Sequence, residues 1–308
     1  MINKNKSRTL GQRDRKNLIF YCCMLAFPVL QLCVFYIYVN FNSIVMSFQK
    51  FDVNTNKFSF NGFENYKKII NDFKLLPELE HAIGNSFKVY FYSAIVGMIA
   101  GLMFAYYIFK KRFASTFFKV IMYSPAVISS TVIVTMFLMF VEDYLPYVIN
   151  NKFGTHLIGF LTEDKTKFPT LIIYSLWVGL GTQILLYLGA MNNISDSVLE
   201  AAQLDGVSPI REFFSIVLPQ IFPTIIVFIC TGLASVFVNQ LNLYTFYVRK
   251  APPELYTVGY YMYRKLISST SFSNYPYVAA MGIMVTLVTT PTVLLIRKLL
   301  NRLDPMGN

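Results

Sequence analysis

Polar side chains within otherwise charge-free hydrophobic runs are the residues of this sequence that could do chemistry. Gln183 and Tyr187 are four residues apart in one run, so a helix would place them on the same face. A second group, at the end of the next run, consists of Asn239, Gln240, Asn242 and Tyr244. Amide and hydroxyl groups beside aromatic rings could bind a sugar, but they could equally hydrogen-bond between neighbouring helices. We take these residues as candidates for a substrate path.

Catalytic and metal-binding patterns are hard to find in the sequence. The phosphate-binding pattern G-x4-G-K-[ST] is absent, so the chain is not expected to hydrolyse ATP itself. His81 and His156 stand without nearby metal-ligand spacing and are interpreted as surface histidines. Free, apolar-packed thiols are expected for the four cysteines, which are Cys22, Cys23, Cys33 and Cys230. We expect no catalytic residue, no bound metal and no cofactor.

Composition predicts a polytopic membrane protein. Hydrophobic residues make up 55% of the 308, and charged residues only 14%, which is outside the usual range for a soluble domain. About 20 apolar residues span a bilayer core as a helix. Six charge-free runs are long enough, namely 17–49, 89–109, 120–141, 168–195, 213–248 and 266–296. The expected fold is therefore an all-α membrane protein with six transmembrane helices.

The first run, 17–49, could be mistaken for a cleavable signal peptide because it follows a basic tail. Its apolar core is far longer than a signal segment and shows no small-residue cleavage pattern, so we expect a retained span.

Orientation follows from the basic residues at the start of the chain. Six Lys and Arg stand against a single acid, Asp14, in residues 1–16, which favours a cytoplasmic N-terminus. With six spans, both termini and the segment 192–216 then lie on the cytoplasmic side, and the outer loops are 50–88, 142–167 and 249–265. The net charge of +11 is explained by this asymmetry and by attraction to lipid phosphates, without a nucleic-acid partner.

The segment from Glu200 to Pro219 is polar and lies between two long hydrophobic runs. Ser197 and Glu200 are spaced as a capping box that would start a helix. Gly206 is the residue expected where that helix stops, because glycine adopts the left-handed conformation at least cost. Ser208 followed by Pro209 predicts the start of a second helix. A plain linker between two spans would share these features.

The spacing within this segment is more specific than its caps. It follows the pattern EAA-x3-G-x9-I-x-L-P, whose seven positions are Glu200, Ala201, Ala202, Gly206, Ile216, Leu218 and Pro219. This resembles the cytoplasmic signature of permease subunits of binding-protein-dependent ABC importers. The resemblance implies a short coupling helix between the fourth and fifth spans, which docks in a cleft of an ATP-hydrolysing subunit. Asp205, in the phrase Leu204-Asp205-Gly206, is included among the coupling residues.

The resemblance also implies the organisation and the partners of the chain. A basic cytoplasmic tail at 1–16 would precede a permease domain at 17–300 and a short cytoplasmic tail at 301–308. The partners would be two ATP-binding subunits, a second and different permease, an extracytoplasmic solute-binding protein and membrane lipid. The location would be the bacterial plasma membrane, and the mechanism would be alternating access.

The cargo follows less directly. The six-span layout and the string Asn61-Gly62-Phe63-Glu64-Asn65-Tyr66 are similar to sugar-transporting permeases, so a sugar or oligosaccharide is the expected cargo. After the fifth span the string Tyr247-Val248-Arg249-Lys250-Ala251-Pro252-Pro253 departs from the Thr-Gly-Gly-Pro-like loop of many such permeases. Another small solute, such as a glycerophosphodiester, stays open as an alternative.

Two alternatives come from other classes of protein. A secondary transporter would need ion-coupling acids within the spans, yet all 16 Asp and Glu lie outside the charge-free runs. A polytopic membrane enzyme would need a nucleophile, an acid pair or a metal cluster. The acidic pairs Glu142 with Asp143 and Glu163 with Asp164 are interpreted as solvated loop residues.

Small residues and prolines indicate how the spans pack. Gly97, Gly101 and Ala105 recur at every fourth position of the second run and predict a close helix contact. Pro125, in the third run, removes a backbone donor and is expected to kink its helix.

Overall fold

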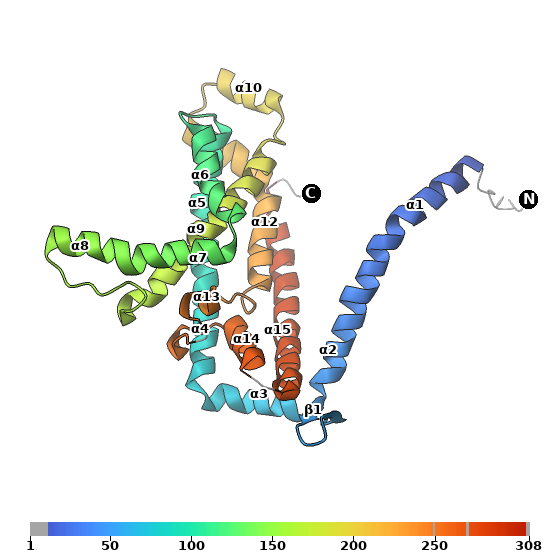
Figure 1. The fold of residues 1–308 in the computed structure, drawn as a ribbon. Helices are drawn as coiled ribbons and strands as arrows, with labels where there is room; N and C mark the ends of the chain where they lie inside the picture. The colour runs from blue at the N-terminus through green and yellow to red at the C-terminus, as the bar shows by residue number, and fades with distance from the viewer. Residues whose placement is uncertain (1–11, 249, 269–270, 306–308) are drawn as a thin grey trace, which may run out of the picture. The chain divides into compact units, whose positions relative to one another are not determined.

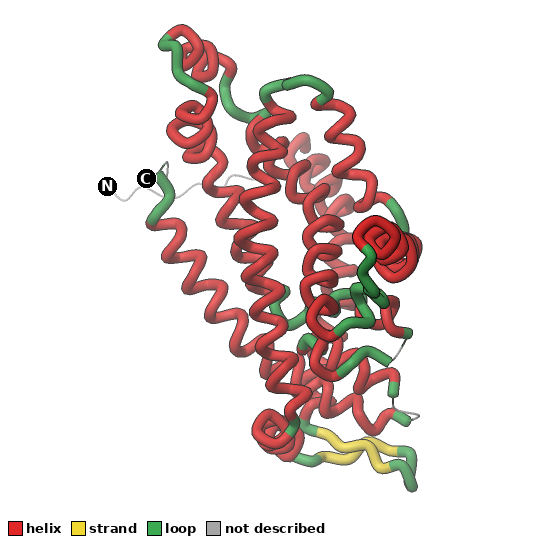
Figure 2. The backbone as a smooth tube through the Cα atoms, turned by 90° about the vertical axis from the view of Figure 1, so that its left-hand side faces the viewer, coloured by secondary structure: helices red, strands yellow, loops and turns green. Residues whose placement is uncertain are grey.

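The computed structural model of the chain describes residues 12–248, 250–268 and 271–305. Most of the described chain is helical (Figure 1), and its strands are confined to one small hairpin (Figure 2). The fold class predicted from the sequence is confirmed, apart from this hairpin. The first eleven residues of the predicted basic tail and the end of the C-terminal tail lie outside the described residues.

Six helical segments are long and apolar enough to cross a membrane, as the sequence predicts. Their bounds are Asn17–Ser47, Pro77–Phe109, Ser130–Phe153, Asp164–Met191, Pro209–Ala234 and Phe272–Arg302. The third and fifth differ most from the hydrophobic runs, and the second differs at its start. The second helix begins twelve residues before its charge-free run, because Glu78, Glu80 and Lys88 interrupt the run but not the helix.

The chain divides into two compact units. The first comprises Met1–Lys67 and Ser271–Ile283, and the second comprises Lys68–Thr270 and Met284–Asn308. Two helices, α3 (Glu64–Leu75) and α15 (Tyr275–Arg302), contribute residues to both.

The first unit consists of the N-terminal helix, a hairpin and the segment before α15. Its other elements are α1 (Gln12–Gln31), the π-helical η1 (Leu32–Tyr38), α2 (Val39–Ser47), β1 (Gln49–Asp52), β2 (Lys57–Phe60) and η6 (Phe272–Asn274). The antiparallel hairpin pairs Phe51 with Phe58, whose rings meet edge to face at 5.0 Å between centroids. The buried amide of Asn65 donates to the carbonyls of Ser47 and Gln49, at 2.8 and 2.7 Å, and so fixes the end of α2 to the hairpin.

The second unit holds the remaining spans and the segments that connect them. From the N-terminal side these are α4 (Pro77–Tyr92), η2 (Ser93–Gly97), α5 (Met98–Phe109), α6 (Ser115–Val127), α7 (Ser130–Met139), η3 (Phe140–Tyr144), α8 (Leu145–Phe153) and α9 (Asp164–Met191). They are followed by α10 (Asp196–Leu204), α11 (Pro209–Glu212), η4 (Phe213–Val217), α12 (Leu218–Ala234), α13 (Leu243–Tyr247), η5 (Pro253–Leu255) and α14 (Val258–Ile267).

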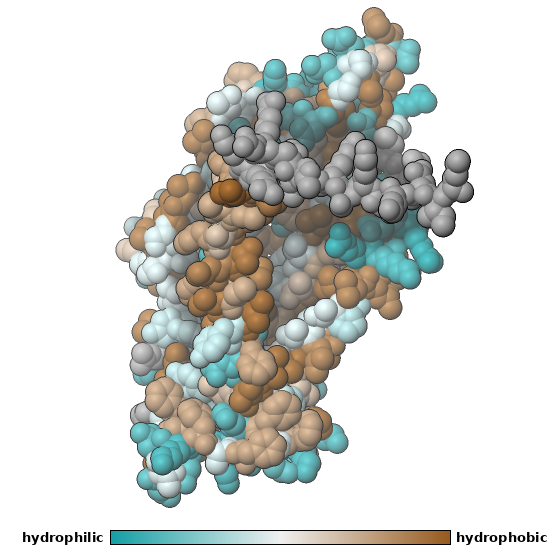
Figure 3. Space-filling view, turned by 90° about the vertical axis from the view of Figure 1, so that its right-hand side faces the viewer, coloured by the Kyte–Doolittle hydropathy of each residue, from teal (hydrophilic) through white to brown (hydrophobic). Residues whose placement is uncertain are grey.

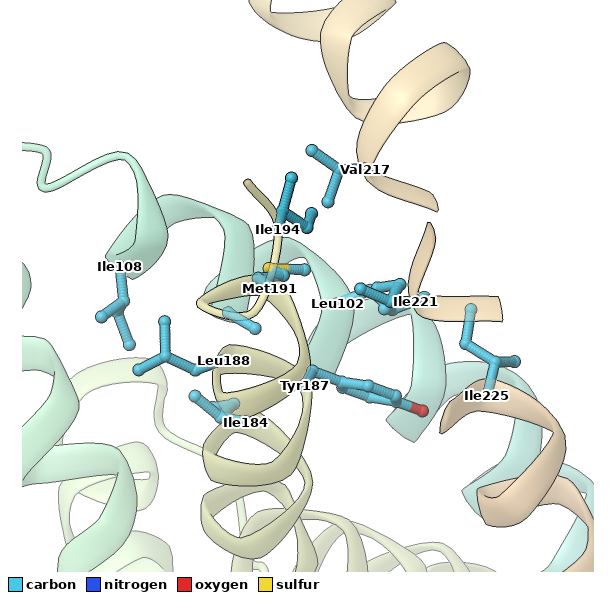
Figure 4. Packing of buried hydrophobic residues seen from close by; sticks show 11 residues of the cluster. Leu102, Ile108, Ile184, Tyr187, Leu188, Met191, Ile194, Val217, Ile221 and Ile225 are labelled. Carbon is cyan, nitrogen blue, oxygen red and sulfur yellow. The ribbon is translucent and has the colours of Figure 1, made fainter. Parts of the chain in front are cut away.

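The core of the second unit lies where α5, α9 and α12 meet. Figure 4 shows Tyr187 and Met191 of α9 beside Leu102 of α5 and Ile221 of α12. The side chains of Tyr187 and Ile221 are each 1% exposed, and that of Met191 is fully buried. Because lipid tails are as apolar as these residues, close van der Waals packing supplies most of the attraction between such helices.

The small-residue stripe of the second span makes the predicted close contact. A Cβ added at Gly101 would lie 3.2 Å from the ring of Tyr187, and one at Gly97 would lie 3.2 Å from Oε1 of Gln183. Ala105, one turn further on, is fully buried. The stripe therefore lets α5 approach the face of α9 that carries two of the candidate path residues.

The third hydrophobic run is not one continuous helix. Helix α6 passes through Pro125, because the Ser124 hydroxyl donates to the Ile121 carbonyl that the proline leaves without its backbone partner, at 2.9 Å. The helix ends instead at Val127, where Ile128 is extended, and α7 starts at Ser130. The helix therefore breaks about one turn after Pro125, and the kink at Pro125 itself stays a prediction. Helical structure continues past the run, through η3 and α8.

Apolar side chains are exposed over much of the chain, as a membrane protein requires. Hydrophobic residues form broad areas on the face drawn in Figure 3. In the span Asn17–Ser47, none of the most hydrophobic window is buried. Such a surface in water would drive association, whereas in lipid it is the ordinary state.

Candidate functional site

The segment between the fourth and fifth spans forms a short helix, α10, at one end of the second unit (Figure 1). It starts two residues earlier than the sequence predicts. Ser195, not Ser197, occupies the N-cap position. The hydroxyl groups of Ser195 and Ser197 form a hydrogen bond with each other at 2.6 Å. No side chain caps the helix, so the predicted capping box of Ser197 and Glu200 is wrong. Asp196 instead places a negative charge in the first turn, where the helix dipole favours it.

The other two predicted caps are confirmed. Gly206 has φ +65°, so the chain leaves α10 through the left-handed conformation that glycine adopts most readily. Helix α11 begins at Pro209, and the Ser208 hydroxyl accepts a hydrogen bond from the backbone N–H of Arg211 at 3.4 Å. The chain therefore turns between two short helices, and the residue types at Gly206, Ser208 and Pro209 predicted where it turns.

The seven motif residues and Asp205 divide into an exposed set and a packed set. Glu200, Ala201, Asp205 and Gly206 are exposed, whereas Ala202 is 5% exposed. Ile216, Leu218 and Pro219 are half-buried, and they flank the fully buried Val217 at the start of the fifth span. The first part of the motif can therefore contact a partner, and the last part joins that surface to the packed core.

Gln183 and Tyr187 lie inside the bundle. Together with Tyr90 and Phe228 they line a cavity of about 70 Å³ between α4, α9 and α12. The Oε1 atom of Gln183 is buried and has no hydrogen-bond partner within the described residues. A buried acceptor without a partner costs free energy, so this amide is poised for a donor. Tyr187 packs its ring on Phe228, at 4.7 Å between centroids.

The second predicted group lies after α12 and is largely used for local structure. The side chain of Asn239 accepts from the backbone N–H of Leu241 at 2.8 Å, and Asn242 has φ +51°. The amide of Asn242 donates to the Tyr174 hydroxyl at 3.4 Å, and the ring of Tyr244 meets that of Tyr263 edge to face at 5.5 Å. Gln240 is exposed.

The two groups do not converge on one site. Gln183 and Tyr187 line the small cavity in the core of the second unit. Asn242 instead hydrogen-bonds to Tyr174, which precedes Gln183 by about two and a half turns of α9. A single small ligand could not contact both groups at once, although both could follow one another along a path.

The segment after the second group is fixed to α4. The buried amide of Asn85 donates to the carbonyls of Glu254 and Tyr256, at 2.7 and 3.0 Å, and the Thr257 hydroxyl donates to the carbonyl of Asn239 at 2.6 Å. The Tyr256 hydroxyl accepts from Arg264. Burial raises the pKa of the Tyr256 phenol to about 12, although the charge of Arg264 opposes this shift. The phenol therefore stays protonated at neutral pH.

A groove between α9 and α12, lined by apolar side chains together with four polar ones, was not predicted from the sequence. It has a volume of about 620 Å³, and its polar lining residues are Asn193, Gln220, Thr224 and Thr231. Gln220, Thr224 and Thr231 are four and seven residues apart, which puts them on one face of α12. This spacing was visible in the sequence and would have been the signal. In a membrane span, such a face is expected to turn toward protein or water.

Metal ligands do not cluster in the part of the chain that the structure describes. No group of three or more His, Cys, Asp or Glu side chains is close enough to hold a metal ion there. The cysteines are free thiols; Cys230 is buried, and Cys22, Cys23 and Cys33 are exposed.

Comparisons with known proteins place the chain among membrane permeases. The profile of the family described as "Binding-protein-dependent transport system inner membrane component" matches residues 94–305, which is more than half of the chain. The chain belongs to this family. It is thus a multi-pass inner-membrane protein and the permease component of an ABC transporter, in which a partner subunit carries the ATPase.

Three similar proteins illustrate the relationship. The glucose import system permease protein GlcT of Saccharolobus solfataricus is 26% identical over 260 residues, covering 77% of this chain and 86% of that protein. The arabinooligosaccharides transport system permease protein AraP of Bacillus subtilis is 26% identical over 266 residues, covering 84% and 82%. A crystal structure of a bacterial alginate ABC transporter, in complex with alginate pentasaccharide-bound periplasmic protein, has a chain that superposes with a TM-score of 0.73 at 21% identity, covering 96% and 98%.

Proposed function

We propose that this chain moves a sugar or an oligosaccharide into the cell by ATP-driven alternating access. The proposal is supported by the cargo named for two similar permeases, glucose and arabino-oligosaccharides. Its main structural support is α10, a short, exposed helix that carries the EAA motif between the fourth and fifth spans.

The surface of α10 suits docking in a groove. Glu200 offers a charge, Ala201 adds little bulk, and Leu204, 89% exposed, offers an apolar contact. An exposed leucine beside small residues favours insertion into an apolar cleft of a partner. In the proposed mechanism, closure of the ATP-binding subunits displaces α10, and the bundle reopens toward the other side of the membrane.

The full importer would contain two ATP-binding subunits, a second and different permease subunit, and an extracytoplasmic solute-binding protein. Both termini and α10 would face the cytoplasm, which agrees with the basic residues of the N-terminal tail. The sugar would pass Gln183 and Tyr187 and the polar residues after α12, and the groove with Gln220 and Thr224 would extend this path.

The decisive experiment is affinity purification of the tagged chain from its native membrane, followed by mass spectrometry. We expect an ATP-binding subunit, a second permease and a solute-binding protein to accompany it. The recovered binding protein is then screened against glucose, arabino-oligosaccharides and glycerophosphodiesters by thermal shift. A shift with the sugars alone supports the proposed cargo, and a shift with the diesters alone replaces it by the rival cargo.

Variants of the motif test the role of α10. Glu200→Lys and Gly206→Pro should lose the ATP-binding subunit in the purification while the chain still inserts in the membrane. Retention of the ATPase at wild-type yield in both variants would contradict docking at α10. Recovery of the chain without any ATPase under mild detergent would contradict the proposed complex as a whole.

A further inference from the structure

A buried ion pair joins the end of α5 to α11, the helix that follows the proposed docking helix. Lys110 directly follows α5, and Glu212 is the last residue of α11. The Lys110 Nζ atom lies 2.9 and 3.0 Å from the two carboxylate oxygens of Glu212. The Lys110 side chain is 19% exposed and that of Glu212 is 4% exposed. The pair links residues 102 positions apart in sequence.

Two further contacts bind the same elements. The Tyr106 hydroxyl donates to the Pro209 carbonyl at 2.9 Å, and the Tyr106 ring lies 4.9 Å from that of Phe213, between centroids. Helix α11 is therefore held to the end of α5 at its first residue, at its last residue and directly after it. We call this set of three contacts the α5–α11 latch.

The latch contrasts with the exposed helix that precedes it. Glu200 and Leu204 of α10 are exposed, and the chain between α10 and α11 passes through Gly206 in its left-handed conformation. A displacement of α10 reaches the fifth span through α11. Because the latch fastens α11 to α5, the same displacement must also move the second span or break a buried ion pair. Breaking it would leave Glu212 charged without its partner, at 4% exposure, which is strongly unfavourable.

We propose that Lys110 and Glu212 are positioning residues for transport, whose ion pair makes α11 and the end of α5 move as one body. The motion of α10 is thereby delivered to the second and fifth spans together. The second span carries the glycine stripe that packs on Gln183 and Tyr187, so the latch connects the docking helix with the candidate path. This inference rests on the proposed docking of an ATP-binding subunit at α10.

The test is hydrogen exchange of the purified native complex, without nucleotide and with ATP plus vanadate. In the wild type we expect nucleotide to change exchange both in α10 and at the end of α5. In Glu212→Gln and in Lys110→Met, nucleotide should still change the hydrogen exchange of α10. The nucleotide-induced change at the end of α5 should become at least about five times smaller, because coupling between two sites usually changes an equilibrium at least about fivefold. The charge swap Lys110→Glu with Glu212→Lys should restore it.

Controls separate this role from a loss of folding. Lys111→Met removes the same charge from the adjacent, exposed position and should respond like the wild type. Co-purification of the ATP-binding subunit shows that each variant assembles, and Glu212→Gln keeps the shape of the side chain. An unchanged response at the end of α5 in both single variants overturns the latch. A wild-type complex in which α10 itself ignores nucleotide overturns the proposed docking as well, so the two failures are distinguishable.

Discussion

At the scale of single residues, Gly206 is the clearest case in which one residue type fixes a turn. Its φ of +65° would strain a residue with a β-branched side chain, although no atom lies within 4 Å of where a Cβ would stand. The cost of substitution is therefore one of backbone conformation and not of space. It amounts to about 1–2 kcal/mol for an ordinary residue, and asparagine tolerates the conformation better.

We predict that Gly206→Val releases the ATP-binding subunit far more readily than Gly206→Asn does. Valine disfavours the left-handed conformation, so the turn from α10 to α11 would shift and carry the docking surface with it. The measurement is the amount of ATPase that co-purifies with each variant as detergent concentration rises. Equal retention in the two variants would mean that the left-handed turn is not needed for docking.

Alanine substitutions at two glycines of α9 are expected to differ in their effect on thermal stability. A Cβ at Gly181 would lie 2.6 Å from the backbone oxygen of Met122 in α6, whereas nothing lies within 4 Å of one at Gly189. Gly181→Ala should therefore separate α6 from α9 and lower the thermal stability of the purified protein, since overpacking costs about 1–3 kcal/mol. Gly189→Ala is the matched control and should leave the melting temperature unchanged. A similar melting temperature for both variants would show that α6 adjusts at no cost.

The candidate residues show what local sequence can and cannot predict. Gly206, Ser208 and Pro209 were placed correctly, because caps and turns depend on the residue itself and its immediate neighbours. The ion pair of Lys110 and Glu212 was not found, because no local pattern relates residues 102 positions apart. The capping box failed because Ser195 was an equally suitable N-cap two residues earlier.

At the scale of elements, the hydrophobic runs located the spans but not the helix boundaries. Helix α4 extends the second span through Glu78 and Glu80, and the third run is divided between α6 and α7. Run length reflects contact with lipid, whereas helix ends depend on backbone hydrogen bonds. At Pro125, for example, the Ser124 hydroxyl donates to the Ile121 carbonyl in place of the missing backbone N–H, and α6 continues.

The connection from α4 to the segment before α14 makes a prediction at this scale. Asn85 satisfies the carbonyls of Glu254 and Tyr256 from a position that is 5% exposed. Asn85→Leu would leave two acceptors without a partner, at about 1–3 kcal/mol for each buried group. We expect faster hydrogen exchange in residues 251–258. The control is Asn151→Leu, which replaces an exposed amide on α8 and should change nothing there. Unaltered exchange in Asn85→Leu would show that other contacts hold this segment.

At the scale of the whole molecule, the sequence established a six-span membrane protein because the bilayer imposes one rule on every span. Each span needs about 20 apolar residues, and an acid at the centre of the bilayer is costly. No comparable rule determines which polar residues line the path of the cargo. The sequence suggested two polar groups, and these lie in different parts of the second unit. The polar side chains of the groove between α9 and α12 come from two hydrophobic runs together.

That groove gives the last prediction. Polar side chains such as Gln220 and Thr224 would be unfavourable against lipid, so we expect the groove to hold water in at least one state of the transport cycle. In a background without native cysteines, Thr224→Cys should react with a water-soluble thiol reagent, because only the hydrated thiol ionises readily. Leu287→Cys, at a 67% exposed apolar position on α15, is the control.

We expect the Thr224→Cys thiol to react at least about ten times faster than the control, since one unit of thiol pKa changes the thiolate population tenfold. ATP plus vanadate should alter the first rate and not the second, because alternating access opens and closes the path while lipid contact persists. Equal and slow reaction at both positions, with and without nucleotide, would show that the groove is covered by protein or lipid throughout the cycle. The proposed cargo would then have to pass along the other polar residues, beside Gln183 and Tyr187.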